Sequence, residues 1–240
     1  YNMKRLILSS LCFLILSPVF SQGVWTWMGG SKYANDKGKY VGDSLWPSAK
    51  LSACMVQDDS GHVWMFGGQG SDSLNAMGFF SDLWKWNGEK FILITGHPIM
   101  NQHDNPNGFK GPLPRQEASC FIQGDSLFYL FGGGLSYIES RNDFWKYNVP
   151  EGKWQLINGD TSGMDTSRYV KPGEADSLNH PSSRTSMIYW QENDTFHIFG
   201  GENIRYMFNE HWFWTSDGWT YSRGYDDYNY KFNYISKGKY

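Results

Sequence analysis

One short stretch occurs three times in the sequence, and no other feature constrains the fold as strongly. It reads Phe66-Gly67-Gly68, Phe131-Gly132-Gly133 and Phe199-Gly200-Gly201, and the copies stand 65 and 68 residues apart. Each copy ends an apolar run and is followed by an acidic residue and a tryptophan, at Asp82/Trp84, Asp143/Trp145 and Glu210/Trp212. Because self-similarity at a fixed period is the signature of repeat architectures, we expect an array of similar units.

A second pattern recurs four times with nearly the same period. An aromatic residue is followed two positions later by a bulky apolar or aromatic residue, and five positions later by a glycine. The aromatic residues are Trp25, Phe91, Trp154 and Trp219, at intervals of 66, 63 and 65 residues. The repeat therefore includes this segment as well as the Phe-Gly-Gly stretch.

Each unit is predicted to contain four short strands. The first strand follows a basic residue, at Lys50, Arg115 or Arg184, and ends in a polar turn. The second strand is apolar without alternation, so both of its faces should be covered. Four antiparallel strands repeated at even spacing are typical of β-propeller blades, whose faces pack against neighbouring blades. We therefore predict an all-β propeller with about three blades, at about 48–96, 113–159 and 182–224.

These motifs resemble Kelch repeats. The resemblance rests on the Phe-Gly-Gly stretches and on two further segments, Asp82-Leu83-Trp84-Lys85-Trp86-Asn87 and Asp143-Phe144-Trp145-Lys146-Tyr147-Asn148. The long linker, from Trp25 to Tyr40, is similar to that of Kelch proteins exported by Bacteroidetes-type bacteria. The resemblance covers residues 23–240 and implies a propeller. Its implication for activity is weak, because Kelch propellers serve as binding platforms, scaffolds and occasionally enzymes.

The N-terminal segment has the layout of a secretory signal. Lys4 and Arg5 precede an apolar run, which ends in a turn-prone segment with a small residue at Ser21. We expect residues 1–22 to be a signal peptide and the mature protein to be secreted or held in the cell envelope. A buried N-terminal helix is the alternative. The apolar run is too short to span a bilayer, which needs roughly 20 residues, and no second such run follows.

The charge of the chain argues against nucleic acid as a partner. The net charge is −3, and it becomes −5 when the two basic residues of the signal are removed. No basic stripe remains that could follow a phosphate backbone.

Three blades are too few to close a propeller, which has about four to eight. We expect further blades of the same polypeptide beyond residue 240, with residues 225–240 beginning the next linker. The segment 23–30 is expected to be a strand that completes the final blade. Assembly from several chains is the alternative.

Two cysteines, Cys54 and Cys120, lie at nearly equivalent points of the first two units. They could form a disulfide between units, which export would permit. They could also be free thiols inside strands, since free cysteine behaves as a small buried hydrophobe. We favour free thiols, because the repeat does not bring the two residues within bonding distance by itself.

The long loops indicate where binding should occur. Loops leaving the second and fourth strands of antiparallel blades emerge on the same edge, and long loops on a rigid scaffold usually carry function. Trp46, Phe79, Tyr137 and Tyr206 are aromatic residues on these loops and are the candidate binding residues for a protein or a glycan. The alternative is that these rings fold inward and fill gaps between blades.

An enzyme is the second candidate function. The Kelch scaffold is shared with copper oxidases resembling galactose oxidase, but no residue cluster here matches their site. Sialidase-like propellers carry a turn that residues 215–220 approach, but the glycine is misplaced. We therefore predict no catalytic residue, no metal site and no cofactor in this chain. A carbohydrate-active or copper-dependent enzyme completed by missing blades stays the alternative.

Overall fold

The structure is a computed structural model that describes residues 25–99, 111–135, 138–161, 166–168 and 172–224. The chain divides into two compact units, residues 1–30 and 31–240. In the first unit only residues 25–30 are described, and they form no strand, with Trp25 99% exposed. The expected strand at 23–30 is thus not formed over 25–30. Its predicted partner, a closing blade, is not among the described residues.

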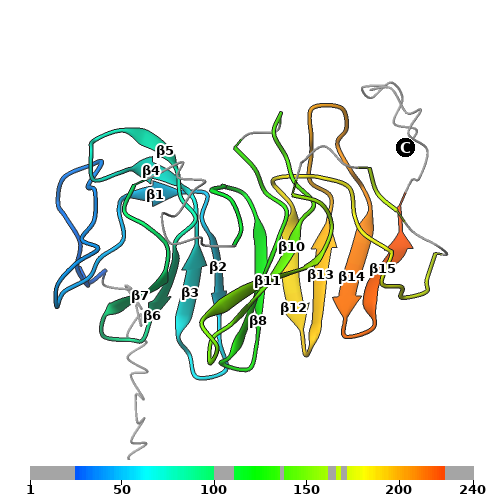
Figure 1. Ribbon diagram of the computed structural model, residues 1–240, viewed down its shortest axis with the longest axis horizontal. Coiled ribbons are helices and arrows are strands. Elements are labelled where there is room, and N and C mark those ends of the chain that lie inside the picture. Colours follow the sequence, from blue (N-terminus) through cyan, green and yellow to red (C-terminus); the bar gives the residue numbers. More distant parts are fainter. Residues whose placement is uncertain (1–24, 100–110, 136–137, 162–165, 169–171, 225–240) are drawn as a thin grey trace, which may run out of the picture. The chain divides into compact units, whose positions relative to one another are not determined.

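The second unit contains three four-stranded antiparallel sheets, which we call blades 1, 2 and 3 (Figure 1). Within each blade the strands lie side by side in the order in which they occur in the sequence. The described residues contain no helix. Blade 1 consists of β2 (Cys54–Gln57), β3 (Val63–Phe66), β6 (Leu83–Trp86) and β7 (Phe91–Thr95). Blade 2 consists of β8 (Ser119–Gln123), β9 (Leu127–Phe131), β10 (Phe144–Asn148) and β11 (Lys153–Asn158). Blade 3 consists of β12 (Ile188–Glu192), β13 (Thr195–Phe199), β14 (His211–Thr215) and β15 (Gly218–Arg223). This confirms the all-β, propeller-like fold.

A smaller sheet accompanies blade 1. It is formed by β1 (Lys50–Leu51), β4 (Gln69–Ser71) and β5 (Met77–Phe79), in the order β1-β4-β5. The hairpin of β4 and β5 lies within the long loop between β3 and β6. The loop therefore has strand structure of its own.

The register makes corresponding residues of the blades identifiable. Each Phe-Gly-Gly phenylalanine pairs with one residue of the first strand and one of the third. The triplets are Cys54–Phe66–Leu83, Ser119–Phe131–Phe144 and Ile188–Phe199–His211. Since side chains alternate across a strand, these triplets lie on the same face of their blades. We call it the leading face, because in blades 1 and 2 it packs on the next blade.

Two apolar clusters hold the blades together. The first joins the leading face of blade 1, including Trp64 and Phe66, to residues of blade 2 such as Phe128 and Trp145. The second joins the leading face of blade 2, including Phe121 and Phe131, to residues of blade 3 such as Phe196, Ile198 and Trp212. Trp84, Trp145 and Trp212 are all buried, as repeated core tryptophans should be. The continuous apolar character of β9 in blade 2 follows from this packing on both of its faces.

The double glycines link each blade to the next. The Gly68 N–H donates to the Arg115 carbonyl oxygen at 2.8 Å, and the Gly133 N–H donates to that of Arg184 at 2.9 Å. Gly67 has a φ of +67°, and a Cβ placed on it would lie 2.5 Å from the Arg115 carbonyl oxygen. Only glycine adopts this positive φ without strain and leaves room for the Arg115 carbonyl oxygen at this distance. The motif is therefore an attachment point between blades.

The basic residue that opens each blade is buried in an ion pair. Arg115 makes two hydrogen bonds to Asp143, of 2.6 and 2.7 Å, and Arg184 makes one of 2.5 Å to Glu210. In blade 1 Lys50 pairs with Asp82. In all three blades the same carboxylate accepts the indole N–H of the tryptophan two residues later, at 2.6 to 2.9 Å. Burial lowers the pKa of Lys50, an effect that Asp82 opposes.

Cys54 and Cys120 are free and buried, as the free-thiol interpretation expects. They belong to the cluster between blades 1 and 2. Burial raises the pKa of the Cys120 thiol, and the neighbouring Cys54 raises it further. A neutral thiol in an apolar cluster packs as a small hydrophobe.

Candidate functional site

The loops between the second and third strands of the three blades form the candidate site. They comprise residues 69–80, 134–141 and 202–208, of which 136 and 137 are not described. All three loops lie along the upper edge of Figure 1, whereas the short turns of the blades lie along the lower edge. We call the three loops the loop edge and the opposite side the turn edge.

The first loop is held rigidly by a buried carboxylate. Asp72 is 1% exposed, and its Oδ1 accepts hydrogen bonds from the N–H groups of Leu74, at 2.8 Å, and Ala76, at 2.9 Å. Its backbone N–H donates to the Ala76 carbonyl oxygen. Such a turn fixes the loop tip because the side chain replaces backbone partners. Leu74 is thereby presented on an ordered support.

The other two loops have similar supports. In blade 3 the Asn203 side-chain oxygen accepts from the N–H groups of Arg205 and Tyr206, and its Nδ2 donates to the Ser183 carbonyl oxygen. In blade 2 Gly134 forms a bridge with Ser140. The first two loops are therefore braced by contacts within the loop, and the loop of blade 3 is also bonded to the segment that precedes β12.

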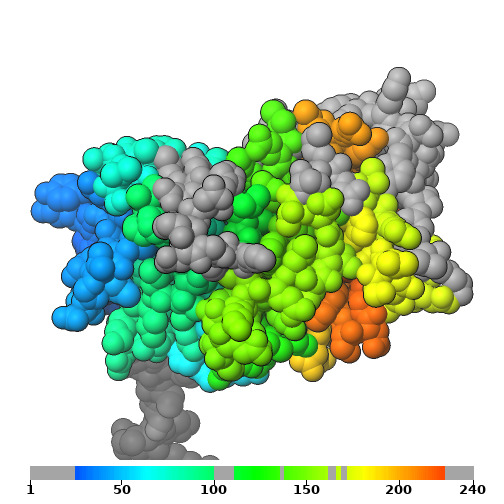
Figure 2. Space-filling view, viewed as in Figure 1, coloured from blue at the N-terminus to red at the C-terminus, as the bar shows by residue number. Residues whose placement is uncertain are grey.

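Aliphatic and methionine side chains are exposed at these tips. The exposed fractions are 68% for Leu74, 55% for Met77, 47% for Ile138, 50% for Ile204 and 66% for Met207. Each of three consecutive blades contributes at least one of them, and the loop segments appear in cyan, green and orange along the upper edge of Figure 2. Single exposed apolar residues are ordinary on protein surfaces. A series repeated on the same edge of all three described blades is a candidate binding surface.

The aromatic residues predicted from the sequence are placed differently. Trp46 is partly buried and packs edge-on against Phe91, with ring centroids 5.0 Å apart. Phe79 and Tyr206 are also partly buried, and Tyr206 lies 6.2 Å from the Phe208 ring. Tyr137 lies outside the described residues. The three described rings are thus neither fully exposed nor fully buried, and their role in binding stays a prediction.

These exposed apolar residues were not predicted from the sequence, because only aromatic residues of the loops were considered. Their signal is an apolar residue directly after a turn-forming side chain, such as Leu74 after Asp72-Ser73 and Ile204 after Asn203. Turn formers keep the following residue at a loop tip, where it cannot reach the core.

The turn edge carries polar side chains that form hydrogen bonds with one another and with the backbone. The buried Asp58 accepts hydrogen bonds from the Trp64 indole N–H and the His62 backbone N–H, each at 2.8 Å. Burial alone would raise the pKa of Asp58, but these hydrogen bonds and the nearby His62 ring lower it overall. Ser60 of blade 1 donates to Asp125 of blade 2. These carboxylates have structural partners.

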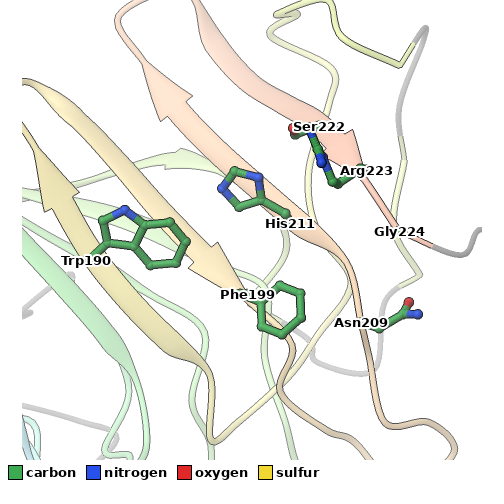
Figure 3. Close-up of a pocket in the computed structure, with 7 residues that line it drawn as sticks. All are labelled: Trp190, Phe199, Asn209, His211, Ser222, Arg223 and Gly224. Carbon is green, nitrogen blue, oxygen red and sulfur yellow. The ribbon is translucent and has the colours of Figure 1, made fainter. Parts of the chain in front are cut away.

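A hollow of about 620 Å³ lies on the leading face of blade 3. Figure 3 shows Trp190 from β12, Phe199 from β13, His211 from β14 and Arg223 from β15 around it. Every strand of the blade therefore contributes to the hollow. The residues of blades 1 and 2 that correspond to Phe199 and His211 are buried between blades, so the hollow lies on a sheet face and is not built from loops.

Two histidines distinguish this face from those of the other blades. His197 Nδ1 lies 3.1 Å from His211 Nε2, and the Trp190 ring stacks on the His197 ring with centroids 4.9 Å apart. Burial lowers the pKa of both histidines. For His211 the neighbouring His197 and Arg223 lower it further, whereas Glu192 opposes the effect at His197. Within the described residues no three His, Cys, Asp or Glu side chains gather as a metal site. No helix there is long and apolar enough to cross a membrane.

Comparison with known proteins identifies the fold alone. No family model matches the chain, and no curated protein matches it in sequence. Among solved structures it is similar to that of YjhT, a β-propeller, with a TM-score of 0.51 and 12% identity. The match covers 76% of this chain and 55% of that chain, so this chain spans about half the length of YjhT. Membership of the Kelch repeats stays a prediction.

Proposed function

We propose that the protein is an exported Kelch-type propeller that acts as a binding module, and that its loop edge binds a protein partner. The observation that carries this proposal is the exposure of aliphatic and methionine side chains on the loops of all three described blades. A propeller-like fold suits a binding or scaffold role, since loops on a rigid support can vary independently of the core.

The exposed side chains favour a protein partner over a glycan. Sugar rings are usually bound by exposed aromatic faces, but Trp46, Phe79 and Tyr206 are partly buried. Methionine and leucine instead suit the apolar side chains of another protein, and methionine adapts its shape to the partner. The exposed polar residues Asn75, Glu139 and Arg205 lie beside the apolar tips. An apolar centre with a polar rim is the usual composition of protein interfaces.

The proposal is tested with a variant that removes the apolar tips. Leu74→Ser, Met77→Ser, Ile204→Ser and Met207→Ser are combined in one chain. Its partner is captured with the unchanged chain, identified by mass spectrometry and purified. We expect the affinity of the purified partner for the variant to fall by at least about 100-fold, because several buried apolar contacts are lost. The measurement is isothermal titration calorimetry.

The matched control alters the turn edge. Asp59→Ser, Glu151→Ser and Asn193→Ser change exposed turn residues and should leave the affinity within about twofold. Equal loss in both variants, or unchanged binding by the loop-edge variant, would exclude the loop edge as the binding surface. Binding of the unchanged chain to immobilised glycans, with retention after the four substitutions, would also contradict the proposal.

A further inference from the structure

Blade 2 carries an arginine where the other two blades carry a phenylalanine. The backbone N–H groups of Phe80, Arg141 and Phe208 each donate to the carbonyl oxygen of the second glycine of their blade, at 2.8 to 3.0 Å, so the three residues occupy corresponding positions. In blades 1 and 3 the phenylalanine ring lies against the basic residue that opens the blade, with its centroid 4.0 Å from Lys50 Nζ or Arg184 Cζ. In blade 2 a second cation takes the place of this ring.

The charges of blade 2 therefore do not balance. In blades 1 and 3 one buried cation pairs with one carboxylate. In blade 2 the corresponding carboxylate, Asp143, already bonds both terminal nitrogens of Arg115 and the Trp145 indole N–H. Arg141 forms no ion pair within the described residues, although the exposed Glu139 lies in the same loop. Burial lowers the pKa of Arg141, and the neighbouring Arg115 lowers it further, whereas Asp143 and Glu139 oppose this effect.

One edge of the Arg141 guanidinium is unused. Its Nη1 donates to the Thr161 carbonyl oxygen at 2.7 Å. Its Nε is buried and has no hydrogen-bond partner in the part of the chain that the structure describes, and Nη2 has none there either. Nε and Nη2 form the edge of a guanidinium that binds a carboxylate through two parallel hydrogen bonds. The side chain is therefore prepared for an anion that the blade itself does not supply.

Two further polar groups beside Arg141 are unpaired. The Ser140 hydroxyl, in a residue that is 1% exposed, and the Gln116 side-chain oxygen are buried without a partner among the described residues. Gly134 forms bridges with both Gln116 and Ser140, so these groups lie on adjacent strands of one small sheet. Buried polar groups are nearly always paired. Water would satisfy the hydroxyl and the amide, but it would not balance the charge of Arg141.

We propose that the site formed by Gln116, Ser140 and Arg141 binds the carboxylate of an aspartate or glutamate side chain of the protein partner. This inference rests on the proposed function and names the chemistry of the partner at the loop of the middle blade. A carboxylate accepts hydrogen bonds from Nε and Nη2 of Arg141 and from the Ser140 hydroxyl, and the Gln116 amide presents its NH2 group by rotation. Its single negative charge balances the excess charge of blade 2. The exposed Ile138, in the same loop, provides apolar contact beside it.

The chain alone is tested first, with acetate as the probe. Thermal unfolding is followed while acetate replaces chloride at constant ionic strength. Arg141→Phe introduces the residue of blades 1 and 3, and Arg141→Lys keeps the charge without the two parallel donors. The control Lys153→Leu removes an exposed positive charge at the start of β11, on the turn edge. We expect acetate to raise the unfolding temperature of the unchanged chain and of the control by at least about 2 °C more than that of either Arg141 variant.

The partner captured with the unchanged chain is tested second. Arg141→Phe should lower its affinity at least about 10-fold, because a charged hydrogen-bonded pair is lost, whereas Lys153→Leu should leave it within about twofold. Equal acetate shifts in the unchanged chain and both Arg141 variants would overturn the proposal, as would a larger shift with inorganic phosphate than with acetate. Affinity lost in the loop-edge variant but kept in Arg141→Phe would overturn this inference and leave the proposed function standing. Affinity kept in both variants would overturn the two together.

Discussion

At the scale of residues, the buried ion pairs explain why a basic residue opens every blade. Arg115 is 0% exposed and bonds both the Asp143 carboxylate and the Gly132 carbonyl oxygen, at 2.9 Å. Asp143 also accepts from Trp145. The side chain of one residue thus connects the first strand, the double glycine and the third strand of a blade. The cost of burying these charges is offset only if every partner is present.

Removing one member of such a pair should be strongly destabilising. We expect Arg115→Leu to lower the free energy of unfolding by about 3–5 kcal/mol, because Asp143 is left buried without its cation. Chemical denaturation measures this change. The control, Arg205→Leu at an exposed loop position, should change it by less than about 0.5 kcal/mol. Similar small changes in both would show that the ion pair does not stabilise the blade.

The histidine pair predicts a pH dependence of stability. The folded pKa values of His197 and His211 lie below their ordinary value because of burial, so the unfolded chain binds protons first as the pH falls. Their contribution is complete above the unfolded pKa of about 6.5 and is lost as the pH falls toward the folded values. Glu192 and Arg223 also act on the pair, with opposite effects.

The variant His197→Tyr/His211→Phe introduces the residues of blade 2 at the corresponding positions. Urea midpoints measured between about pH 5 and pH 8 should decline less steeply on acidification in this variant than in the parent chain. The other histidines are common to both chains and cancel in the comparison. Parallel curves would contradict the assignment of the pH dependence to this pair.

At the scale of elements, the three double glycines have the same backbone but different surroundings. Gly67, Gly132 and Gly200 have φ values of +67°, +64° and +69°. A methyl group on Gly67 would collide with the Arg115 carbonyl oxygen, whereas Gly124, at +54°, has nothing within 4 Å. The two substitutions Gly67→Ala and Gly124→Ala therefore share backbone strain and differ in the collision.

We expect Gly67→Ala to destabilise the chain by at least about 1–3 kcal/mol more than Gly124→Ala. Gly200→Ala should resemble Gly124→Ala in the 240-residue chain, because among the described residues only one atom, at 3.3 Å, lies near its Cβ position. Thermal denaturation of the three variants provides the comparison. An equal effect of all three would mean that the double glycine is required for its backbone angles alone.

The strands could be predicted from the sequence because their signals are local. The apolar run Leu127–Phe131 and the polar turn before it specify a hairpin without knowledge of the rest of the chain. The partner of Arg115 could not be predicted this way, since Asp143 lies 28 residues away and the spacing alone does not reveal a contact. The loop tips also needed the structure, because turn chemistry at Asp72 and Asn203 decides which side chains remain exposed.

At the scale of the whole molecule, the described blades form a stack with two different edges and one uncovered face. The turn edge joins neighbouring blades through polar contacts such as Ser60–Asp125, whereas the loop edge presents apolar tips. The uncovered leading face of blade 3 is of the kind that blades 1 and 2 bury. The interfaces between blades thus stabilise the fold, whereas binding is proposed for the loop edge. Substitutions on the loop edge should therefore leave the free energy of unfolding nearly unchanged.

Site-specific photo-crosslinking tests whether the loop edge binds the partner. A photoreactive phenylalanine is placed at Leu74 or Met207 on the loop edge and at Asp59 or Asn193 on the turn edge, and the protein is irradiated in its native cells. We predict that the loop-edge positions crosslink to one identified protein and that the turn-edge positions do not. Crosslinks to that protein from the turn edge alone, or equally from both edges, would contradict the account.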